Sequence, residues 1–350
     1  MANRPAAPKN ANRPVTLATV AKAAGVSLPT VSKVIRGRPD VAPETRQAIE
    51  RLLSEYEYVP RPVRRQSPKR RVLDLAFDAL GSAYSLELIR GVVSAAAEAG
   101  VDVVVGLTPD DPHGIQWAQR LTESGRMGVI SVTSSITAEQ VAHFRRAGIP
   151  LVVVDPDDVP EGVPSIGATN WAGGLAATEH LLQLGHRRIA TITGRPNALC
   201  SRARLHGYNA ALEAAKIQAD PELVRYGDFG FELARREALE LLDLPRRPTA
   251  IFAACDYQAL GVVEAARIRG LRVPEDLSVV GFDDVEISRW AAPPLTTVHQ
   301  PLVKMGRVAC QTVLALAAGE RPESDRIELA THLVVRDSAA PPPAASGSSP

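Results

Sequence analysis

The chain has 350 residues, of which 45% are hydrophobic, and its formal net charge at pH 7 is +1. This length predicts two or three globular domains with sizeable cores. No apolar run approaches the roughly 18 residues that a membrane helix needs. The three cysteines are scattered and the N-terminus is polar, so we expect no disulfide framework and no signal peptide, but a reduced, cytoplasmic protein.

The near-neutral total hides two segments of opposite charge. Residues 1–71 hold 15 Lys and Arg against 5 Asp and Glu, a balance of +10, and residues 72–350 hold 25 against 34, a balance of −9. A basic N-terminal fifth on an acidic remainder indicates a polyanion-binding module joined to a second body. A membrane surface would also require a basic helix with bulky apolar residues, which this segment lacks. We expect residues 1–14 to be disordered.

The pattern of residues 16–58 predicts three short helices. Thr16 suits the N-cap of a helix through Ala24, and Gly25 supplies the turn that follows. Ser27 can cap a second helix to about Ile35, and Pro43 opens a third. Each helix has one apolar stripe, formed by Leu17, Val20 and Ala21, by Val31, Val34 and Ile35, and by Ile49, Leu52, Leu53 and Tyr56.

Two short helices joined by a glycine turn are typical of a helix-turn-helix DNA-binding motif. The second helix would lie in the major groove and present Leu28, Pro29 and Lys33 to the base edges. Leu28 and Pro29 lack hydrogen-bonding side chains, so they could sense only groove shape and thymine methyl groups. The alternative is a small helical bundle with a solvated polar face, and the +10 balance favours DNA binding over it.

The segment VTLATVAKAAGVSLPTVSKVIRGRPDVAPETRQAIERLLSEYEYVP (residues 15–60) resembles the DNA-binding domain of the LacI/GalR (lactose/galactose repressor) family of bacterial transcriptional regulators along its whole length. It departs from the family pattern at Thr19, Lys33, Arg36 and Ala42, none of which is a core position. The resemblance implies that Leu28, Pro29 and Lys33 read bases. It also implies phosphate contacts by Thr16, Ser27, Thr30, Ser32 and Tyr58, and we add Arg36 from the same polar helix face.

Residues 60–71, PRPVRRQSPKRR, form a linker with six basic residues, three prolines and no acidic residue. In the resembling family this linker forms a hinge helix on DNA and inserts a leucine into the minor groove. The matching position here is Ser67, followed by Pro68, and proline inside a helix costs about 3 kcal/mol. We therefore expect no leucine wedge, whereas Arg61, Arg64 and Arg65 could enter a narrow minor groove electrostatically. A merely solvated linker is the alternative.

From Val72 onward, β-rich runs alternate with helical segments. We expect strands within residues 72–78, 101–107, 128–133, 150–155, 165–170, 187–194, 223–228, 249–256 and 277–284, and helices over 84–99, 113–124, 137–147, 170–184, 203–216, 229–242 and 257–269. Such alternation predicts doubly wound, parallel sheets of the α/β class. Because these units are too many for one sheet, we expect two α/β subdomains.

Polar residues follow the expected strands, at the carboxyl ends where such sheets bind their ligands. They are Asp78, Ser82, Thr133, Ser134, Asp155, several within residues 197–204, Asp228, Asp256, Asp283 and Asp284, and the aromatic Phe229 lies among them. Carboxylate and guanidinium groups suit the hydroxyls of a sugar, and Phe229 could stack on a pyranose face. Each residue alone reads as an ordinary loop residue, but the set at one sheet edge favours a small-ligand site.

Four further stretches resemble the core of the same family, which has a periplasmic-binding-protein-like fold: residues 180–194, 201–212, 253–284 and 293–301. The resemblance covers residues 15–337. It implies three crossings between an N-subdomain of about 72–163 and 296–324 and a C-subdomain of about 164–295 and 325–337. Its effector cleft would contain Asp155, Arg204, Phe229, Asp256, Asp283 and Gln300, which Asp78 and Thr133 join by position. At Cys255 many members have an asparagine. We expect a disordered tail over residues 338–350.

No GxxxxGK[ST] loop, no GxGxxG after a strand and no G-x-S-x-G elbow is present, and His186 and His299 lack partners at metal-ligand spacing. We therefore expect no enzyme activity, no cofactor and no metal. The resemblance and the charge division predict a homodimeric repressor of sugar-use genes that binds a pseudo-palindromic operator under the control of a small ligand. The alternative is a sugar-binding protein whose basic N-terminus serves another partner.

Overall fold

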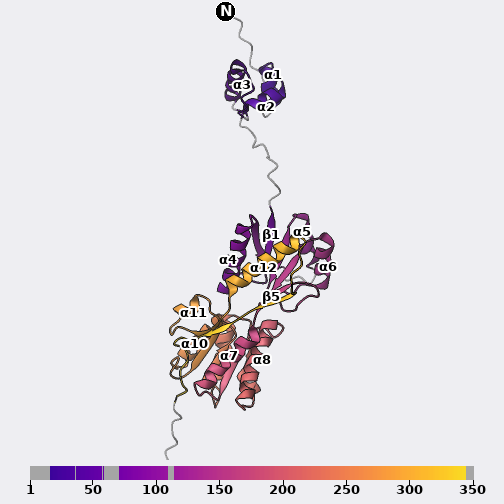
Figure 1. The fold of residues 1–350 in the computed structure, drawn as a ribbon. Helices are drawn as coiled ribbons and strands as arrows, with labels where there is room; N and C mark the ends of the chain where they lie inside the picture. Colours follow the sequence, from indigo (N-terminus) through magenta and orange to yellow (C-terminus); the bar gives the residue numbers. More distant parts are fainter. Residues whose placement is uncertain (1–15, 36, 57, 59–70, 109–113, 344–350) are drawn as a thin grey trace, which may run out of the picture. The chain divides into compact units, whose positions relative to one another are not determined.

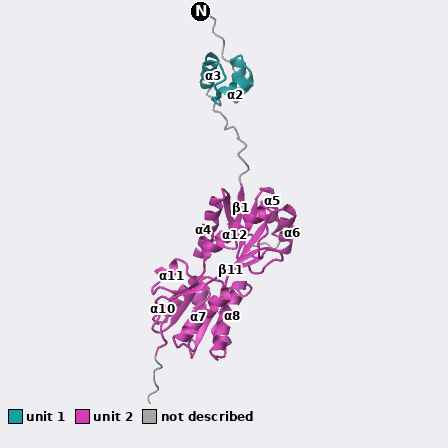
Figure 2. Cartoon of the chain, viewed as in Figure 1, with its two compact units in different colours: residues 1–69 teal, residues 70–350 magenta. Residues whose placement is uncertain are grey.

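The computed structural model describes residues 16–35, 37–56, 58, 71–108 and 114–343. The chain divides into two compact units, Met1–Lys69 and Arg70–Pro350, each described here by itself (Figure 2). Several predictions lie outside the described residues. They concern residues 1–14, the side chain of Arg36, the linker with Arg61, Arg64, Arg65 and Ser67, and residues 344–350.

The first unit contains the three predicted helices, α1 (Leu17–Ala23), α2 (Leu28–Ile35) and α3 (Pro43–Glu55). The predicted cap is confirmed at Thr16, whose side chain accepts a hydrogen bond from the backbone N–H of Thr19. Gly25 takes a φ of +63° between α1 and α2, a conformation that glycine adopts without steric cost. The three apolar stripes meet in one small core of Val20, Ala21, Val31, Val34, Val41 and Ile49.

The second unit contains two six-stranded sheets, and each is the centre of one lobe (Figure 1). The first lobe has the strand order β11-β5-β4-β3-β1-β2, entirely parallel in its pairings. These strands are β1 (Val72–Phe77), β2 (Asp102–Leu107), β3 (Gly128–Val132), β4 (Leu151–Val154), β5 (Ser165–Ala168) and β11 (Arg326–Leu329). Its helices are α4 (Ala83–Glu98), α5 (Ile115–Glu123), α6 (Ala138–Ala147) and α12 (Leu302–Ala317).

The second lobe has the strand order β12-β10-β9-β8-β6-β7, in which only the β10–β12 pairing is antiparallel. These strands are β6 (Ile189–Thr193), β7 (Val224–Tyr226), β8 (Ala250–Ala253), β9 (Ser278–Asp283), β10 (Thr296–His299) and β12 (His332–Val334). Its helices are α7 (Asn170–Gln183), α8 (Leu199–Ala214), α9 (Phe231–Leu242) and α10 (Asp256–Ile268), with the short α11 (Ile287–Trp290) and the 3-10 turn Pro221–Leu223.

Helices cover both faces of each sheet, as the predicted α/β class requires. Leu73, Leu75 and Phe77 of β1 pack under α4 and α12, whereas Ala76 faces the cluster of α5 and α6. In the second lobe, α9 and α10 cover one face and α7 and α8 the other. Two-sided burial explains why most of these strands read as continuous apolar runs.

The chain crosses between the lobes three times, after β5, after β10 and after β11. The predicted subdomain boundaries are wrong at these three strands. They assigned β5 and β11 to the C-subdomain and β10 to the N-subdomain, whereas β5 pairs with β4 and β11, and β10 pairs with β9 and β12. The chain leaves a lobe only after β5, β10 or β11 has paired with its neighbours there, whereas the prediction had the chain cross before each of these strands.

The C-terminal segment departs from the predicted disordered tail. Ser338 is fully buried, and its hydroxyl donates to the carbonyl of Val279 at 2.6 Å and accepts from the N–H of Thr296 at 2.8 Å. The backbone of Ala340 bonds to the side chains of Ser278 and His186. These bonds hold residues 338–340 against the second sheet, so that prediction is wrong for them.

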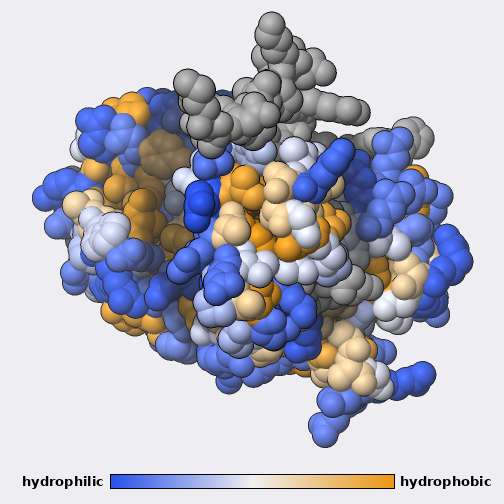
Figure 3. Space-filling model, turned by 90° about the horizontal axis from the view of Figure 1, so that it is seen from above, coloured by the Kyte–Doolittle hydropathy of each residue, from blue (hydrophilic) through white to orange (hydrophobic). Residues whose placement is uncertain are grey.

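Helix α8 begins at Leu199, four residues before its expected start. Its N-cap is Ala198, whose side chain cannot accept a capping hydrogen bond. The sequence therefore has no Ser, Thr, Asp or Asn at this position that would have predicted the start of the helix. No helix among the described residues is long and apolar enough to span a membrane. The surface visible in Figure 3 is mainly hydrophilic, with separate apolar areas between the polar residues.

Candidate functional site

Helix α2 of the first unit presents the side chains that were predicted to read DNA. Leu28 is 48% exposed, and Pro29 and Lys33 are exposed as well, whereas Val31 and Val34 on the opposite side are buried. The polar side is therefore free of the unit's own core. The structure brings these three predicted residues onto one accessible helix.

The residues predicted to contact phosphates differ in how exposed their side chains are. The Ser27 hydroxyl caps α2 by accepting from the N–H of Thr30 at 3.4 Å, and it lies 2.8 Å from the Thr30 hydroxyl. Thr16 is exposed at the start of α1, while Ser32 and Tyr58 are half-buried. The hydroxyls of Ser27 and Thr30 hold each other in place, and Thr16 remains accessible.

An ion pair on this surface was not foreseen. The ammonium group of Lys33 donates to Oδ2 of Asp40 at 2.7 Å, and both side chains are about half exposed. The hydrogen bond from Lys33 lowers the pKa of the Asp40 carboxyl. Asp40 lies seven residues after Lys33, beyond the end of α2, so helical spacing gave no signal for the pair.

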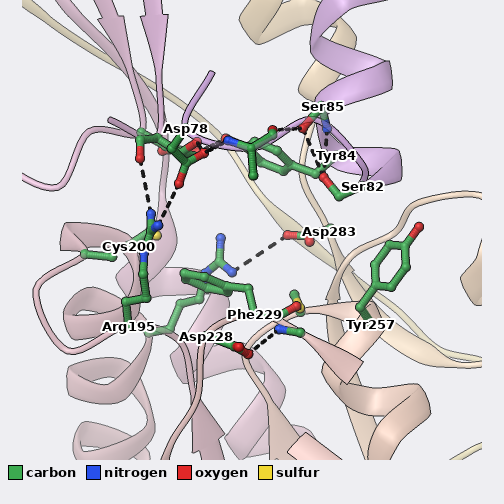
Figure 4. A pocket seen from close by; sticks show the side chains of 17 residues that line it. Asp78, Ser82, Tyr84, Ser85, Arg195, Cys200, Asp228, Phe229, Tyr257 and Asp283 are labelled. Carbon is green, nitrogen blue, oxygen red and sulfur yellow. Dashed lines mark hydrogen bonds and ion pairs between the residues drawn. The ribbon is translucent and has the colours of Figure 1, made fainter. Parts of the chain in front are cut away.

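A cavity of about 250 Å³ lies between the two lobes of the second unit (Figure 4). Six of the eight predicted effector residues line it: Asp78, Thr133, Asp155, Arg204, Phe229 and Asp283. Three of them follow β1, β3 and β4 of the first lobe, and the other three come from α8, the loop after β7 and the end of β9 in the second lobe. The strand-end positions of both sheets thus converge on one site.

Four of these lining residues have a left-handed backbone. The φ angles are 52° at Thr133, 42° at Asp155, 69° at Phe229 and 106° at Asp283. Such conformations cost about 1–3 kcal/mol each in non-glycine residues and cluster at ligand-binding sites. For the β-branched Thr133 the conformation is a clear outlier. The left-handed backbone lets these residues line the cavity, and the cost of the conformation indicates a ligand-binding site.

The ring of Phe229 packs closely on Gly194, the first residue after β6. A Cβ atom at position 194 would lie 2.0 Å from Cζ of Phe229, so a larger residue there would displace the ring. Gly194 therefore fixes the aromatic face that lines the cavity, the face predicted to stack on a sugar.

Arg204 is the buried cation of the site, with only 3% of its surface exposed. Its Nε donates to Oδ1 of Asn170 at 2.8 Å, one Nη donates to the carbonyl of Ala254, and the same Nη lies 3.7 Å from Oδ1 of Asp283. The guanidinium carbon lies 3.7 Å from the centre of the Phe282 ring. These contacts fix its position at the cavity wall.

Burial raises the pKa of Asp283 to about 6, although Arg204 and a hydrogen bond from Gln300 favour its charged form. Burial also raises the pKa of Asp155, which accepts a 2.7 Å hydrogen bond from the Tyr84 hydroxyl. Both carboxylates are costly to keep ionised without further donors. A ligand that brings hydroxyl groups would supply such donors.

Two predicted effector residues do not line the cavity. Asp256 is fully buried, and its carboxylate accepts from the Thr297 hydroxyl at 2.6 Å and from the N–H of Val285 at 2.9 Å. Gln300 is buried behind Asp283 and donates to its Oδ1 at 2.6 Å. Both side chains turn toward partners inside the second lobe, so Gln300 orients Asp283 and Asp256 ties β10 to the segment after β9.

Asp283 and Asp284 have different partners, as expected for neighbours at a strand end. Asp284 pairs with Arg336 and lies 3.0 Å from Nδ1 of His299, away from the cavity lining. His186 is buried and bonds to Thr249 and Ser278, which is the structural role expected for it.

Six lining residues were not predicted from the sequence: Ala79, Tyr84, Ser85, Arg195, Gly230 and Tyr257. Arg195 is the second residue after β6, so the strand-end rule applied to it and would have found it. Tyr84 and Tyr257 lie one residue inside α4 and α10, where the sequence does not tell which side of the helix faces the cavity.

Two thiols complete the wall. Burial raises the pKa of Cys200 to about 11 and that of Cys255 well above its usual range, so both are neutral. The Cys255 thiol donates to the carbonyl of Phe229 at 3.2 Å. In place of an asparagine, the chain therefore has a weakly polar surface at this position.

Two family models match the chain. Residues 16–61 match the model of bacterial regulatory proteins of the lacI family, and residues 178–339 match a periplasmic binding protein-like domain. The first match covers the described helices α1 to α3, and the second covers most of the second lobe.

Two relatives match the chain over nearly its whole length. The chain is 36% identical to the HTH-type transcriptional regulator CelR of Thermobifida fusca, over 92% of this chain and 98% of the relative. It is 32% identical to the HTH-type transcriptional repressor CytR of Escherichia coli (strain K12), over 92% of this chain and 96% of the relative.

Two solved structures are similar over nearly the whole chain. One is a complex of the transcriptional regulator CelR with cellobiose, with a TM-score of 0.71 and 35% identity over 93% of this chain and 99% of the other. The second is the lac repressor dimer bound to operator and the anti-inducer ONPF, with a TM-score of 0.70 and 29% identity over 94% and 100%.

Proposed function

Because the chain belongs to the LacI family of bacterial regulatory proteins and is a DNA-binding transcription regulator, not an enzyme, we propose that it is a repressor of carbohydrate-use genes. A sugar in the cavity between the lobes sets its affinity for the operator. The observation that carries the proposal is the cavity itself. Asp155 of the first lobe and Arg204, Asp283 and the ring of Phe229 of the second lobe line it.

On DNA, α2 enters the major groove, with Lys33 as the hydrogen-bonding reader of bases and Leu28 and Pro29 as apolar contacts. Lysine donates to the O6 and N7 atoms of guanine, and apolar side chains contact the thymine methyl group. Thr16, Ser27, Thr30, Ser32, Tyr58 and Arg36 hold the phosphates that orient this helix, and Arg61, Arg64 and Arg65 act from the linker.

The ligand is a neutral mono- or oligosaccharide. The cavity offers carboxylate acceptors in Asp155 and Asp283, a guanidinium donor in Arg204 and the ring of Phe229, which together suit a polyhydroxylated ring. The similar CelR structure contains cellobiose, which makes cellobiose the first compound to test.

Control of DNA binding follows from linkage. A ligand that contacts both lobes binds one relative orientation of the lobes more tightly than another, and it shifts the population toward that orientation. A helix-turn-helix dimer needs half-sites about one helical turn apart. A change in lobe orientation alters the separation of the two DNA-reading units and therefore the operator affinity.

The proposed homodimer uses the first lobe. Leu86 and Val93 on α4 and Val104, Val105 and Leu107 on β2 are exposed, although they are large apolar residues. Exposed large apolar residues that gather on neighbouring elements are typical of protein–protein contacts. A twofold dimer matches a pseudo-palindromic operator, and the similar lac repressor structure is a dimer on its operator.

The test uses the full chain. DNA sites selected from a random library are bound to the purified protein, and fluorescence anisotropy follows the affinity during titration with cellobiose and then with a panel of other mono- and disaccharides. We expect one sugar to change the affinity at least tenfold and to raise the melting temperature.

Arg204→Lys should abolish the response to that sugar while operator binding is kept, because lysine keeps the charge but loses the planar fork. Arg202→Lys, on an exposed position of the same helix, is the matched control and should respond normally. A full response in Arg204→Lys, or selected sites that no sugar affects, would contradict the proposal.

A further inference from the structure

One arginine of the second lobe reaches the ends of three strands of the first lobe. Arg195, two residues after β6, donates from Nη1 to Oδ2 of Asp78 at 2.6 Å and from Nη2 to the carbonyl of Thr133 at 3.2 Å (Figure 4). The same Nη2 lies 3.5 Å from Oδ1 of Asp157. These partners follow β1, β3 and β4, so a single side chain spans the cavity.

The carboxylates around Arg195 are themselves held in place. Oδ1 of Asp78 accepts from the Thr133 hydroxyl and from the N–H of Ala79. Asp157 accepts from Ser135 of its own lobe at 3.1 Å and from Asn197 of the second lobe at 3.3 Å. Asp78 therefore uses both carboxylate oxygens in contacts within the protein, Oδ1 with Thr133 and Ala79 and Oδ2 with Arg195. Because it also lines the cavity, its predicted contact with the effector stays a prediction.

The contact is partly shielded from water. The exposed fractions of the side chains are 33% for Arg195, 26% for Asp78 and 13% for Asp157. Two carboxylates and one carbonyl around a planar guanidinium form a directional contact that lysine or a neutral residue cannot reproduce. The contact breaks if the lobes separate, because its donors and acceptors lie on opposite lobes.

We propose that Arg195 is the positioning residue that holds the two lobes together across the cavity, through Asp78, Thr133 and Asp157. This inference rests on the proposed function, since it names the side chain through which lobe orientation and ligand are linked. Arg195 also lines the cavity, and its buried Nε has no hydrogen-bond partner among the described residues. An oxygen of a bound sugar can accept from that N–H, so ligand and lobe contact share one guanidinium.

The test measures the distance between the lobes without DNA or sugar, so its outcome is independent of the proposed function. Spin labels are attached at Glu139→Cys on α6 and Glu213→Cys on α8 of the full chain, both at exposed positions, while the native cysteines are buried. Pulsed electron resonance then gives the distribution of distances between the labels. Arg195→Gln should broaden it and shift it to longer distances, whereas Arg202→Gln should leave it unchanged.

Further variants separate a positioning role from general damage. Arg195→Lys should restore part of the narrow distribution, because the ammonium group reaches Asp78 but lacks the second donor arm. Asp78→Asn should broaden the distribution as Arg195→Gln does, and the double variant should be no broader than either single one. If Arg195→Gln fails to fold, the variants Arg195→Lys and Asp78→Asn are compared with the parent protein instead. A distribution in Arg195→Gln or Asp78→Asn that matches the parent would overturn the proposal.

Discussion

Lys33 has two possible partners on the surface of the first unit. Its ammonium group pairs with Asp40, and the same group lies on the helix face that is available to DNA. Exposed ion pairs add little stability because water solvates both charges well. Lys33 can therefore leave Asp40 for a guanine at small cost, while the pair keeps the side chain extended away from the protein's core.

We predict that Lys33→Ala weakens operator binding by about 1–3 kcal/mol and binding to random DNA by less, because a base contact is lost only on the correct sequence. Fluorescence anisotropy on both DNAs measures the difference. Lys22→Ala, an exposed lysine at the end of α1, serves as the charge control and should affect both DNAs equally. Equal losses for Lys33→Ala would make Lys33 a phosphate contact.

The carboxylates of the cavity predict a pH dependence. Asp283 has a pKa raised to about 6, mainly by burial, so it is largely protonated below pH 6. Sugar hydroxyls donate best to the ionised form, so sugar binding should lower this pKa and strengthen as the pH rises through 6. Below pH 6 the affinity should fall by up to about tenfold per pH unit, which isothermal titration between pH 5 and 8 measures.

Asp283→Asn is the control, because it removes this titrating group and should leave only the weaker pH dependence that comes from Asp155. The contribution of Asp283 to the stability of the sugar-free protein has the opposite pH dependence. The native state binds a proton that the unfolded state releases between about pH 4 and 6, so this group's contribution to stability decreases as the pH rises through that window. An affinity for the sugar that is constant from pH 5 to 8 would show that Asp283 does not contact it.

The positions of cavity residues that directly follow a strand were predictable, because one rule places the ends of all parallel strands. The carboxyl ends of parallel strands converge, so Asp78, Thr133 and Asp155 could be placed together without a structure. The direction of a strand-end side chain was not predictable. Asp256 turns inward because Thr297 and Val285, from other parts of the chain, offer hydrogen bonds there.

Among the elements, the C-terminal segment after β12 bonds to the first residues of β9 and β10, two inner strands of the second sheet. Ser338 bridges β9 and the start of β10 through Val279 and Thr296, and Ala340 reaches Ser278. These bonds satisfy backbone groups that would otherwise be buried without partners. The segment is therefore part of the second lobe's structure.

Ser338→Ala should lower the free energy of unfolding by about 1–3 kcal/mol, because it leaves the Thr296 N–H and the Val279 carbonyl without this buried partner. Urea denaturation of the full chain measures the change. Ser54→Ala, on an exposed position of α3, is the matched control and should change stability little. An unchanged stability in Ser338→Ala would mean that water replaces the hydroxyl.

The alternation of strands and helices was predictable because most of the buried strands are short apolar runs between helical patterns. Which sheet each strand joins was not, since that depends on pairing between distant segments. β5 and β11 are about 160 residues apart in sequence and pair from Ser165↔Arg326 onward. No local pattern in either strand contains this information.

At the scale of the whole molecule, β2 is one of the two edge strands of the first sheet, and Val104, Val105 and Leu107 are exposed on it. Exposed apolar edge strands are usually covered by a partner. We predict that Val104→Lys combined with Leu107→Lys converts the proposed dimer into a monomer. Light scattering measures the mass, and operator affinity should fall because two half-sites are no longer bound together.

Val335→Lys, which changes an apolar residue of the second lobe that is 60% exposed, is the control and should leave the mass unchanged. The double variant should still bind the sugar, because neither substitution lies at the cavity. A parent protein that is already monomeric at micromolar concentration would refute the proposed dimer.

The three crossings of the chain have a consequence for biosynthesis. The first unit has its own core and lies at the N-terminus, so it can fold as soon as it leaves the ribosome. Neither lobe can be completed then, because β10, α12, β11 and β12 all come from the last sixth of the chain. At about 5–20 residues per second, translation from residue 69 to residue 334 takes on the order of 10–50 s. During that time the DNA-binding unit can already be folded, while both sheets of the second unit still lack strands.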